Sequence, residues 1–362
     1  MRYTANRPTL YVSAAMLQER KITAADVNRF IPNYVRYPVE LEYGSVQRLQ
    51  FLGVRAFLSA LVWFILQPRV TRVGNLNQDE VNAVYDGEAD GYDWKHHMTT
   101  RYQDTMWRRQ AGWFIANLAR SNANMRVLDL CTGTGLTAEA IQEVLTQWGA
   151  SVTVTGLDFN QRMLKRAASR NLGGVEFVLG DATQLVKGQD FGDSPLVQFA
   201  ANTFDAVTQM CGIGGIPRPL EQFEGVLRVL KPGGQFWMHD MHKPLPGLPG
   251  IVVLPKWLAS PALESYVYED VCLPLVLNRL WGWRDPTALF YLLTLVTTSD
   301  VDPTTQQARY FGFEVVNFMF EPQRWWFGIP YMPVAEITVK KVQIAKEEAS
   351  LRSLIGQCCE VL

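Results

Sequence analysis

The stretch Val127-Leu-Asp-Leu-Cys-Thr-Gly-Thr-Gly135 predicts a buried strand, a glycine turn and the start of a helix. Its first four residues form the apolar run that is typical of a parallel strand. The two glycines let the backbone approach a ligand closely, and helical spacing of apolar residues follows from Leu136 to Leu145. The stretch therefore predicts a nucleotide-binding turn. Gly133-x-Gly135-x-x-Ala138 also satisfies the dinucleotide fingerprint, so the motif alone leaves two classes of cofactor open.

Carboxylates follow the next two predicted strands. The β-rich run from Ser151 to Leu157 ends in Asp158, and the run from Val175 to Leu179 is followed by Gly180-Asp-Ala182. A carboxylate in the position of Asp158 can accept hydrogen bonds from both hydroxyls of a ribose, in NAD or in an adenosyl ligand. Asp181 stands where an adenine amino group can be bound.

The alternation of strands and helices continues after these carboxylates. Phe204-Asp-Ala-Val207 predicts a fourth strand, Leu220 to Leu230 a helix, and Lys231-Pro-Gly-Gly234 a sharp turn before a strand from Gln235 to Met238. Two features disfavour NAD: Asp129 lies four residues before the first glycine, and the Lys-Pro-Gly-Gly turn follows a helix.

Taken together and in this order, the motifs resemble those of class I S-adenosyl-L-methionine-dependent methyltransferases. The resemblance implies that Asp129 and the glycine turn face the methionine part of the cofactor, Asp158 holds the ribose and Asp181 contacts the adenine. Cys131 departs from the family, which usually has glycine there. The cofactor-binding residues that the resemblance implies are Asp129, Cys131, Thr132, Gly133, Gly135, Asp158, Phe159, Asp181, Ala182 and Met210.

Within this class, the chain resembles the ubiquinone/menaquinone biosynthesis C-methyltransferases. The matching residues are Tyr92-Asp93, Trp107-Arg108 and Lys243-Pro244. In that family the helix with the Tyr-Asp pair forms a lid over the cofactor, which implies that Tyr92 lies near the sulfonium. The chain departs after the fourth strand, where Cys211-Gly-Ile-Gly-Gly215 replaces Phe-Gly-Leu-Arg-Asn. Both polar groups that face the substrate are therefore missing, which leaves the acceptor open, and Arg218 in the next turn is a candidate replacement.

A general base is needed if the acceptor must lose a proton, as a phenol or quinol does. The candidates stand at the end of the fifth strand, where a side chain can reach the acceptor. The predicted catalytic residues are His242, His239 and Asp240, together with Tyr92 from the lid.

Composition excludes several other functions. The 362 residues carry a formal net charge of −1, which gives no electrostatic reason to expect a nucleic-acid substrate. The five cysteines form no CxxC pair and no signal peptide opens the chain, so a reducing, cytoplasmic setting is expected. The four histidines lack the i, i+4 spacing of a zinc site, and no metal is predicted.

The expected fold is α/β, with a doubly wound, seven-stranded, mostly parallel sheet. We expect an N-terminal helical extension (1–75), a methyltransferase domain (76–341) and a C-terminal tail (342–362). An insertion at 242–298, rich in proline and aromatic residues, is expected to form a substrate cap that suits a flat, apolar acceptor. The last two strands are expected from Tyr310 to Phe320 and from Ala335 to Lys340.

The most hydrophobic helix candidate spans 46–66. Arg48 and Arg55 interrupt it, so its longest apolar run is too short to cross a bilayer, which needs about 20 residues. Arginines at both ends would suit a helix that lies at a membrane surface. Burial against the core or in a homo-oligomer interface is the alternative, which the apolar stripe favours.

The sequence therefore predicts a methyltransferase that uses S-adenosyl-L-methionine and acts on an apolar, aromatic or isoprenoid, quinone-like small molecule. The nearest alternative is a phospholipid or lipid-amine N-methyltransferase. Alternatives from other classes are a non-catalytic cofactor-binding protein and an NAD-dependent oxidoreductase.

Overall fold

A computed structural model describes residues 10–12, 18–30, 78–100, 103–122, 124–186, 196–213, 216, 218–241, 292–321, 325–326, 329–330, 334–357 and 359–361. The predicted helix at 46–66, His242 and the predicted cap from 242 to 291 lie outside these residues. Within the described residues, no helix is long and apolar enough to cross a membrane.

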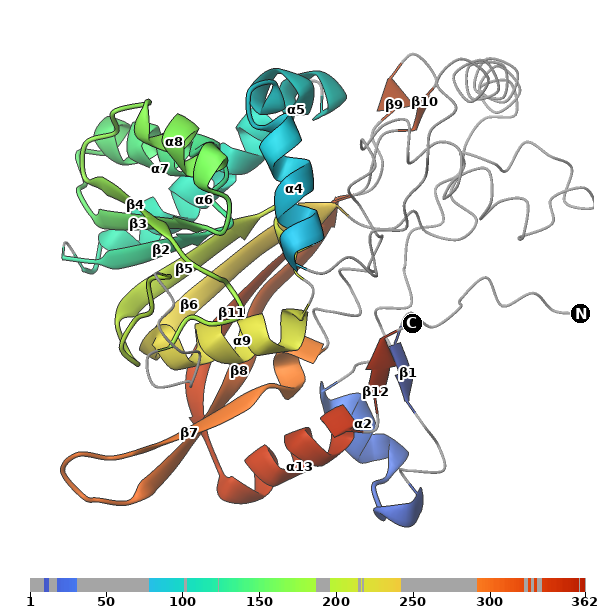
Figure 1. Cartoon of the computed structure of the whole chain (residues 1–362). Coiled ribbons are helices and arrows are strands. Elements are labelled where there is room, and N and C mark those ends of the chain that lie inside the picture. Colours follow the sequence, from blue (N-terminus) through green and yellow to red (C-terminus); the bar gives the residue numbers. More distant parts are fainter. Residues whose placement is uncertain are drawn as a thin grey trace, which may run out of the picture.

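A mixed sheet forms the centre of the molecule, with strand order β4-β3-β2-β5-β6-β11-β8-β7 (Figure 1). The five strands from β4 to β6 are parallel, whereas β11, β8 and β7 pair antiparallel at one end. The strands are β2 (Arg126–Leu130), β3 (Thr153–Asp158), β4 (Val175–Leu179), β5 (Phe204–Met210), β6 (Leu230–Met241), β7 (Thr297–Val301), β8 (Ala308–Glu321) and β11 (Val334–Ile344).

The predicted α/β sheet and its final antiparallel pair are confirmed, but the described residues give it eight strands instead of seven. The additional strand is β7, which overlaps the end of the predicted cap. Its sequence, Thr-Thr-Ser-Asp-Val, lacks an apolar run because β7 lies at the sheet edge and is partly exposed. The turn at Lys231–Gly234 is a bulge within β6: Leu230 pairs with Phe204 and Gln235 with Ala206, and Lys231 Nζ contacts the Asp205 carboxylate at 2.8 Å.

Helices cover both faces of the sheet, as the alternation of strands and helices predicts (Figure 1). One face carries α6 (Gln103–Ala119), α7 (Leu136–Gln147) and α8 (Gln161–Ala168), and the other carries α9 (Pro219–Val229) and α13 (Lys346–Gln357). Side chains of β2 alternate between the two cores: Val127 packs with α6 and α7, and Leu128 and Leu130 pack with α9. Because the strands from β4 to β6 run parallel, the residues that follow them lie at one edge of the sheet.

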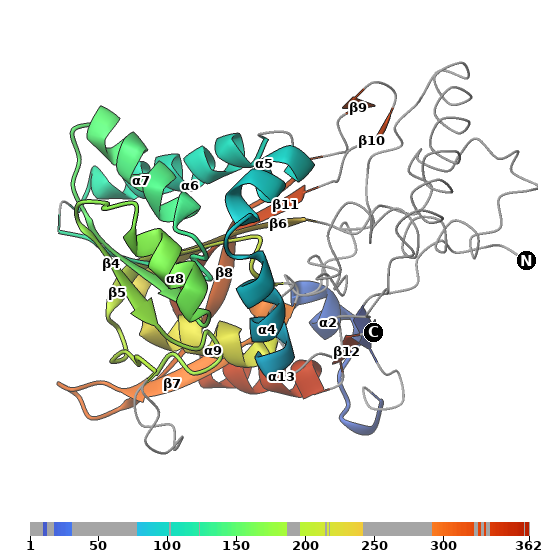
Figure 2. The same ribbon diagram turned by 45° about the horizontal axis from the view of Figure 1, so that its top comes forward.

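Two described segments from opposite parts of the sequence, β1–α2 and α13–β12, lie side by side next to the sheet (Figures 1 and 2). Strand β1 (Leu10–Val12) pairs antiparallel with β12 (Cys359–Val361), and Arg29 of α2 (Ala24–Phe30) contacts Glu348 of α13 at 3.0 Å. Most of the expected C-terminal tail forms α13. Its inner side chains Ala349, Arg352 and Ile355 are buried, so it is an integral part of the fold. A short hairpin joins β9 (Trp325–Trp326) to β10 (Ile329–Pro330).

Candidate active site

A cavity of about 780 Å³, counting the space open at its mouth, lies at the carboxyl ends of the parallel strands. Helix α4 (Gln78–Glu88) and the start of α5 (Tyr92–Thr100) cover it, and these two helices are called the lid below. Nine predicted site residues line it together: Tyr92, Cys131, Thr132, Gly133, Asp158, Phe159, Asp181, Ala182 and Met210. Their placement follows from topology, since they come from the lid and from the ends of four adjacent parallel strands.

The turn after β2 is held by backbone contacts. Thr132 N–H donates to Leu157 O at 3.0 Å, and Gly135 N–H donates to Thr132 O at 2.9 Å. Gly135 has a φ of 83°, and a Cβ there would lie 3.1 Å from Cβ of Ala167 in α8. Glycine is therefore required by conformation and by space, although Gly135 itself does not line the cavity. Cys131 adopts a φ of 54°, a strained value for a residue with a side chain, at the position where the resemblance implies glycine.

Asp129 lies behind this turn and does not line the cavity. It is fully buried, and its two carboxylate oxygens accept hydrogen bonds from Thr132 Oγ1 at 2.7 Å and Thr208 Oγ1 at 2.8 Å. Burial raises the pKa of Asp129 to about 6, against the effect of both hydroxyl donors. The structure therefore differs from the prediction that this side chain faces the ligand: Asp129 connects the glycine turn to β5.

The carboxylate of Asp158 is directed into the turn and the cavity. Oδ2 accepts a hydrogen bond from Gly133 N–H and Oδ1 accepts one from Asn160 N–H, both at 2.8 Å. Burial raises the pKa of Asp158, and the backbone donors oppose this shift. Each carboxylate oxygen retains a further lone pair, so the group can still accept two ligand hydroxyls.

Asp181 is fixed by one of its two oxygens. Oδ1 accepts from both the amide and the hydroxyl of Thr183 at 2.8 Å, whereas no described residue donates to Oδ2. The predicted candidate Arg218 donates to the same Thr183 hydroxyl at 3.2 Å and pairs with Glu221 at 2.8 Å. Arg218 is exposed and does not line the cavity, so the structure does not place it as a replacement for the missing polar groups.

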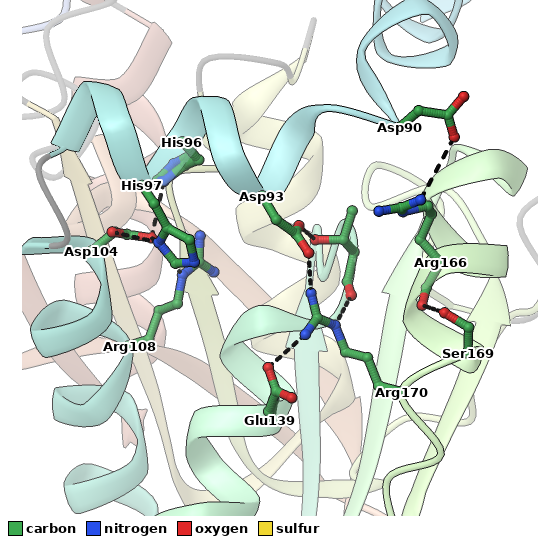
Figure 3. Close-up of polar contacts among 11 residues, drawn as sticks. Asp90, Asp93, His96, His97, Asp104, Arg108, Glu139, Arg166, Ser169 and Arg170 are labelled. Atoms are coloured by element: carbon green, nitrogen blue, oxygen red, sulfur yellow. Dashed lines mark hydrogen bonds and ion pairs between the residues drawn. The ribbon is translucent and has the colours of Figure 1, made fainter.

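The lid is attached to the core by buried amides and ion pairs. The Asn160 side chain, which caps α8, donates to Asn82 Oδ1 at 2.7 Å and to Asp86 Oδ1 at 2.8 Å in α4. Arg170, just beyond α8, pairs with Asp93 of α5 and with Glu139 of α7, the latter at 2.6 Å (Figure 3). Its Nε also donates to Thr134 O in the glycine turn. One guanidinium thus connects the lid, the turn and α7.

Replacing Arg170 with methionine is expected to loosen α5. The lost contacts are partly buried, and such a network contributes about 1–2 kcal/mol, so amide hydrogen exchange across Tyr92–Thr100 should become roughly 10-fold faster. Hydrogen exchange with mass spectrometry measures this rate. Arg162→Met is the matched control, because its ion pair with Asp90 is exposed on both sides and should contribute little. Equal exchange in wild type and Arg170→Met would contradict the role of this contact.

Two of the predicted general bases, His239 and Asp240 near the end of β6, do not line the cavity. His239 is fully buried between the rings of Trp107 and Trp237, with centroids at 5.3 and 5.6 Å, and its Nδ1 lies 3.7 Å from the Glu336 carboxylate. Asp240 is also buried and accepts the backbone N–H of Ile213 at 3.1 Å. Neither side chain lines the cavity, because successive residues of β6 point into the two packed faces of the sheet. Tyr92 does line it, and its ring lies 6.4 Å from that of Tyr85.

Several lining residues were not predicted as site residues. They are Gln78, Val81, Asn82, Tyr85, Arg108, Thr134, Leu157, Asn160, Met163, Gly180, Cys211, Gly212 and Ile216. Arg108 could have been predicted from the sequence, because it belongs to the Trp-Arg pair that matches the family. No sequence pattern indicates the α4 residues as site residues, because their position depends on how the lid folds back over the sheet.

A glycine turn after the first strand of a doubly wound sheet, with carboxylates after the next two strands in one cavity, defines a class I S-adenosyl-L-methionine-dependent methyltransferase. Within this class, residues 73–248, just under half of the chain, match the ubiE/COQ5 methyltransferase family. The family assignment selects S-adenosyl-L-methionine as the cofactor over NAD.

Two of the similar proteins are named demethylmenaquinone methyltransferase. Demethylmenaquinone methyltransferase from Renibacterium salmoninarum is 29% identical over 241 residues, which cover 66% of this chain and 86% of that protein. The protein of this name from Paenarthrobacter aurescens is 31% identical over 179 residues, covering 49% of this chain and 58% of that protein. Among solved structures, phosphoethanolamine N-methyltransferase 1 of Haemonchus contortus, in complex with phosphoethanolamine and S-adenosylhomocysteine, has a TM-score of 0.46 at 16% identity, and the match covers 79% of this chain and 54% of that one.

Proposed function

We propose that the protein transfers a methyl group from S-adenosyl-L-methionine to a ring carbon of an apolar, quinone-like acceptor. The observation that carries the choice of acceptor is the composition of the cavity lining. Tyr85 and Tyr92 of the lid, with Met210 and Ile216 at and after the end of β5, line it with aromatic and apolar side chains. Apart from Asp158 and Asp181, which are proposed to hold the cofactor, the described lining residues contribute no carboxylate that would bind the ammonium of an amine acceptor. The names of the relatives support the same acceptor class.

In this proposal the carboxylates hold the nucleoside part of the cofactor. Asp158 accepts the ribose hydroxyls, and the open oxygen of Asp181 accepts the adenine amino group. The bound cofactor supplies an electrophilic methyl group on a sulfonium. The protein's contribution is to hold both reactants in line and to exclude water, which is the role of the α4–α5 lid.

Tyr92 acts in this proposal as a hydrogen-bond donor. Burial raises the pKa of its hydroxyl far above the ordinary value, so the phenol stays protonated at neutral pH. A neutral phenol can donate to a quinol oxygen and orient the ring, but it does not take up a proton. His239 and Asp240 lie outside the cavity, and a base role for His242 remains a prediction.

A transfer assay tests the proposal. The full chain, with tritium-labelled S-adenosyl-L-methionine, is offered a short-chain demethylmenaquinol or phosphatidylethanolamine vesicles, and mass spectrometry locates the methyl group. We expect C-methylation of the quinol and none of the lipid, and no transfer by Asp158→Ala. Methylation of the lipid amine alone would overturn the acceptor while leaving the cofactor in place.

A further inference from the structure

Two tyrosines of the lid line the cavity side by side. Tyr85 comes from α4 and Tyr92 from α5, and their ring centroids lie 6.4 Å apart with the ring planes at 56°. Neither hydroxyl makes a hydrogen bond to a described residue. A phenol hydroxyl carries one donor and two lone pairs, and leaving it without a partner away from bulk water costs free energy. The lid therefore presents two unused donors to a ligand in the cavity.

The position of Tyr85 is fixed by its neighbours in α4. Asn160, at the start of α8, donates to Asn82 Oδ1 at 2.7 Å and to Asp86 Oδ1 at 2.8 Å. These residues stand three positions before Tyr85 and one position after it, so α4 is held on both sides of the tyrosine. The ring of Tyr92 in turn lies 5.4 Å from the ring of His96. Both rings are thus in place before a ligand binds.

Both tyrosine hydroxyls remain protonated at neutral pH. Burial is the main cause that raises the pKa of the Tyr85 hydroxyl well above its ordinary value, and the nearby Asp158 and Asp240 raise it further. Burial likewise raises the pKa of the Tyr92 hydroxyl. Each hydroxyl can therefore donate its proton to a hydrogen bond with an oxygen of the ligand.

The wall of the cavity at the end of β5 offers no side-chain nitrogen or oxygen among its described residues. This wall is formed by Met210, Cys211, Gly212 and Ile216. The backbone N–H of Cys211 is engaged by His239 O at 2.9 Å. A Cβ on Gly212 would lie 2.7 Å from Cβ of Cys131, so the close approach of the two loops leaves no space for a side chain there. A polar atom of an aromatic ligand against this wall must find its hydrogen-bond donor elsewhere, and the lid tyrosines supply one.

We propose that Tyr85 is an acceptor-binding residue, whose hydroxyl donates a hydrogen bond to a ring oxygen of the acceptor beside the donor Tyr92. This inference rests on the proposed function. It follows from the shape of the lining, in which the two phenols stand in the part of the cavity that also has the apolar side chains of Met210 and Ile216. A flat ring fits among these side chains, and its oxygen then meets the lid. Tyr85 thereby favours oxygenated aromatic acceptors over hydrocarbon rings of the same size.

Two aromatic probes that differ in one oxygen test this assignment. The full chain is saturated with S-adenosylhomocysteine and titrated with 1-naphthol or with naphthalene, whose binding is followed by fluorescence. Tyr85→Phe keeps the ring and removes the hydroxyl. It should weaken binding of 1-naphthol by about 5-fold and leave that of naphthalene within about 2-fold, as expected for the loss of one neutral hydrogen bond. Calorimetry should show that its affinity for S-adenosylhomocysteine also stays within about 2-fold.

Tyr310→Phe is the matched control. Tyr310 is partly buried in β8 and does not line the cavity, so its replacement should change none of these affinities. Unchanged binding of 1-naphthol to Tyr85→Phe overturns the inference, and a simultaneous loss for S-adenosylhomocysteine would assign the hydroxyl to the cofactor. Equal losses for the two probes overturn it as well, because they would show that Tyr85 only shapes the cavity. If the wild type bound S-adenosylhomocysteine but neither probe, the aromatic acceptor of the proposed function would itself be wrong.

Discussion

Asp158→Ala is expected to abolish measurable binding of S-adenosylhomocysteine, with a loss in affinity of roughly 100-fold or more. Hydrogen bonds to a charged group contribute about 1.5–3 kcal/mol each, and the carboxylate is proposed to accept two from the ribose. The same carboxylate holds Gly133 N–H and Asn160 N–H, so its loss also loosens the glycine turn. Isothermal titration calorimetry measures the affinity, and circular dichroism verifies the fold.

Asp302→Ala is the control for the backbone contacts. Asp302 accepts the amide N–H groups of Thr304 and Thr305 in an exposed turn between β7 and β8, so it has the same type of contact without a ligand. Its replacement should leave affinity unchanged. A folded Asp158→Ala protein that binds S-adenosylhomocysteine as tightly as wild type does would refute the ribose role.

Local sequence patterns were sufficient to predict the parallel part of the sheet and most of the residues that line the cavity after its strands. The apolar run of β2, the glycines after it and the strand-terminal carboxylates are all set by short-range requirements of backbone and packing. Parallel strands bring their carboxyl ends to one edge, so the joint position of Gly133, Asp158 and Asp181 follows from the order of elements.

Contacts between distant residues account for the differences. The Asp129 carboxylate is held inside the protein by the hydroxyl of Thr208, 79 residues later. It therefore makes a buried structural contact instead of the predicted contact with a ligand. The His239 imidazole is buried because Trp107 of α6 packs against it, and no pattern within β6 indicates this. Arg170 reaches Asp93 over 77 residues. Such pairs depend on how helices pack on the sheet, which periodicity does not specify.

One buried arginine connects α13 to β8 and to α2. Arg352 of α13 donates from Nη1 to the carbonyls of Thr294, at 2.6 Å, and Phe313, at 2.9 Å. It pairs with Glu348 at 2.6 Å, and its guanidinium lies 4.8 Å from the ring centre of Phe30 in α2. A Cβ on Gly312 would lie 2.9 Å from Nη1, so glycine in β8 gives the guanidinium its space.

Arg352→Met is therefore expected to lower the free energy of unfolding by about 3–5 kcal/mol, because it leaves a carboxylate and two buried carbonyls without their donor. Urea denaturation followed by tryptophan fluorescence measures this loss. Arg309→Met is the matched control: Arg309 has two ionic contacts, with Asp300 and Asp302, one more than Arg352, but it is partly exposed on the β7–β8 hairpin, so its replacement should cost much less. If the two variants were equally stable, burial would not be what makes Arg352 important, and α13 would be held by its apolar side chains alone.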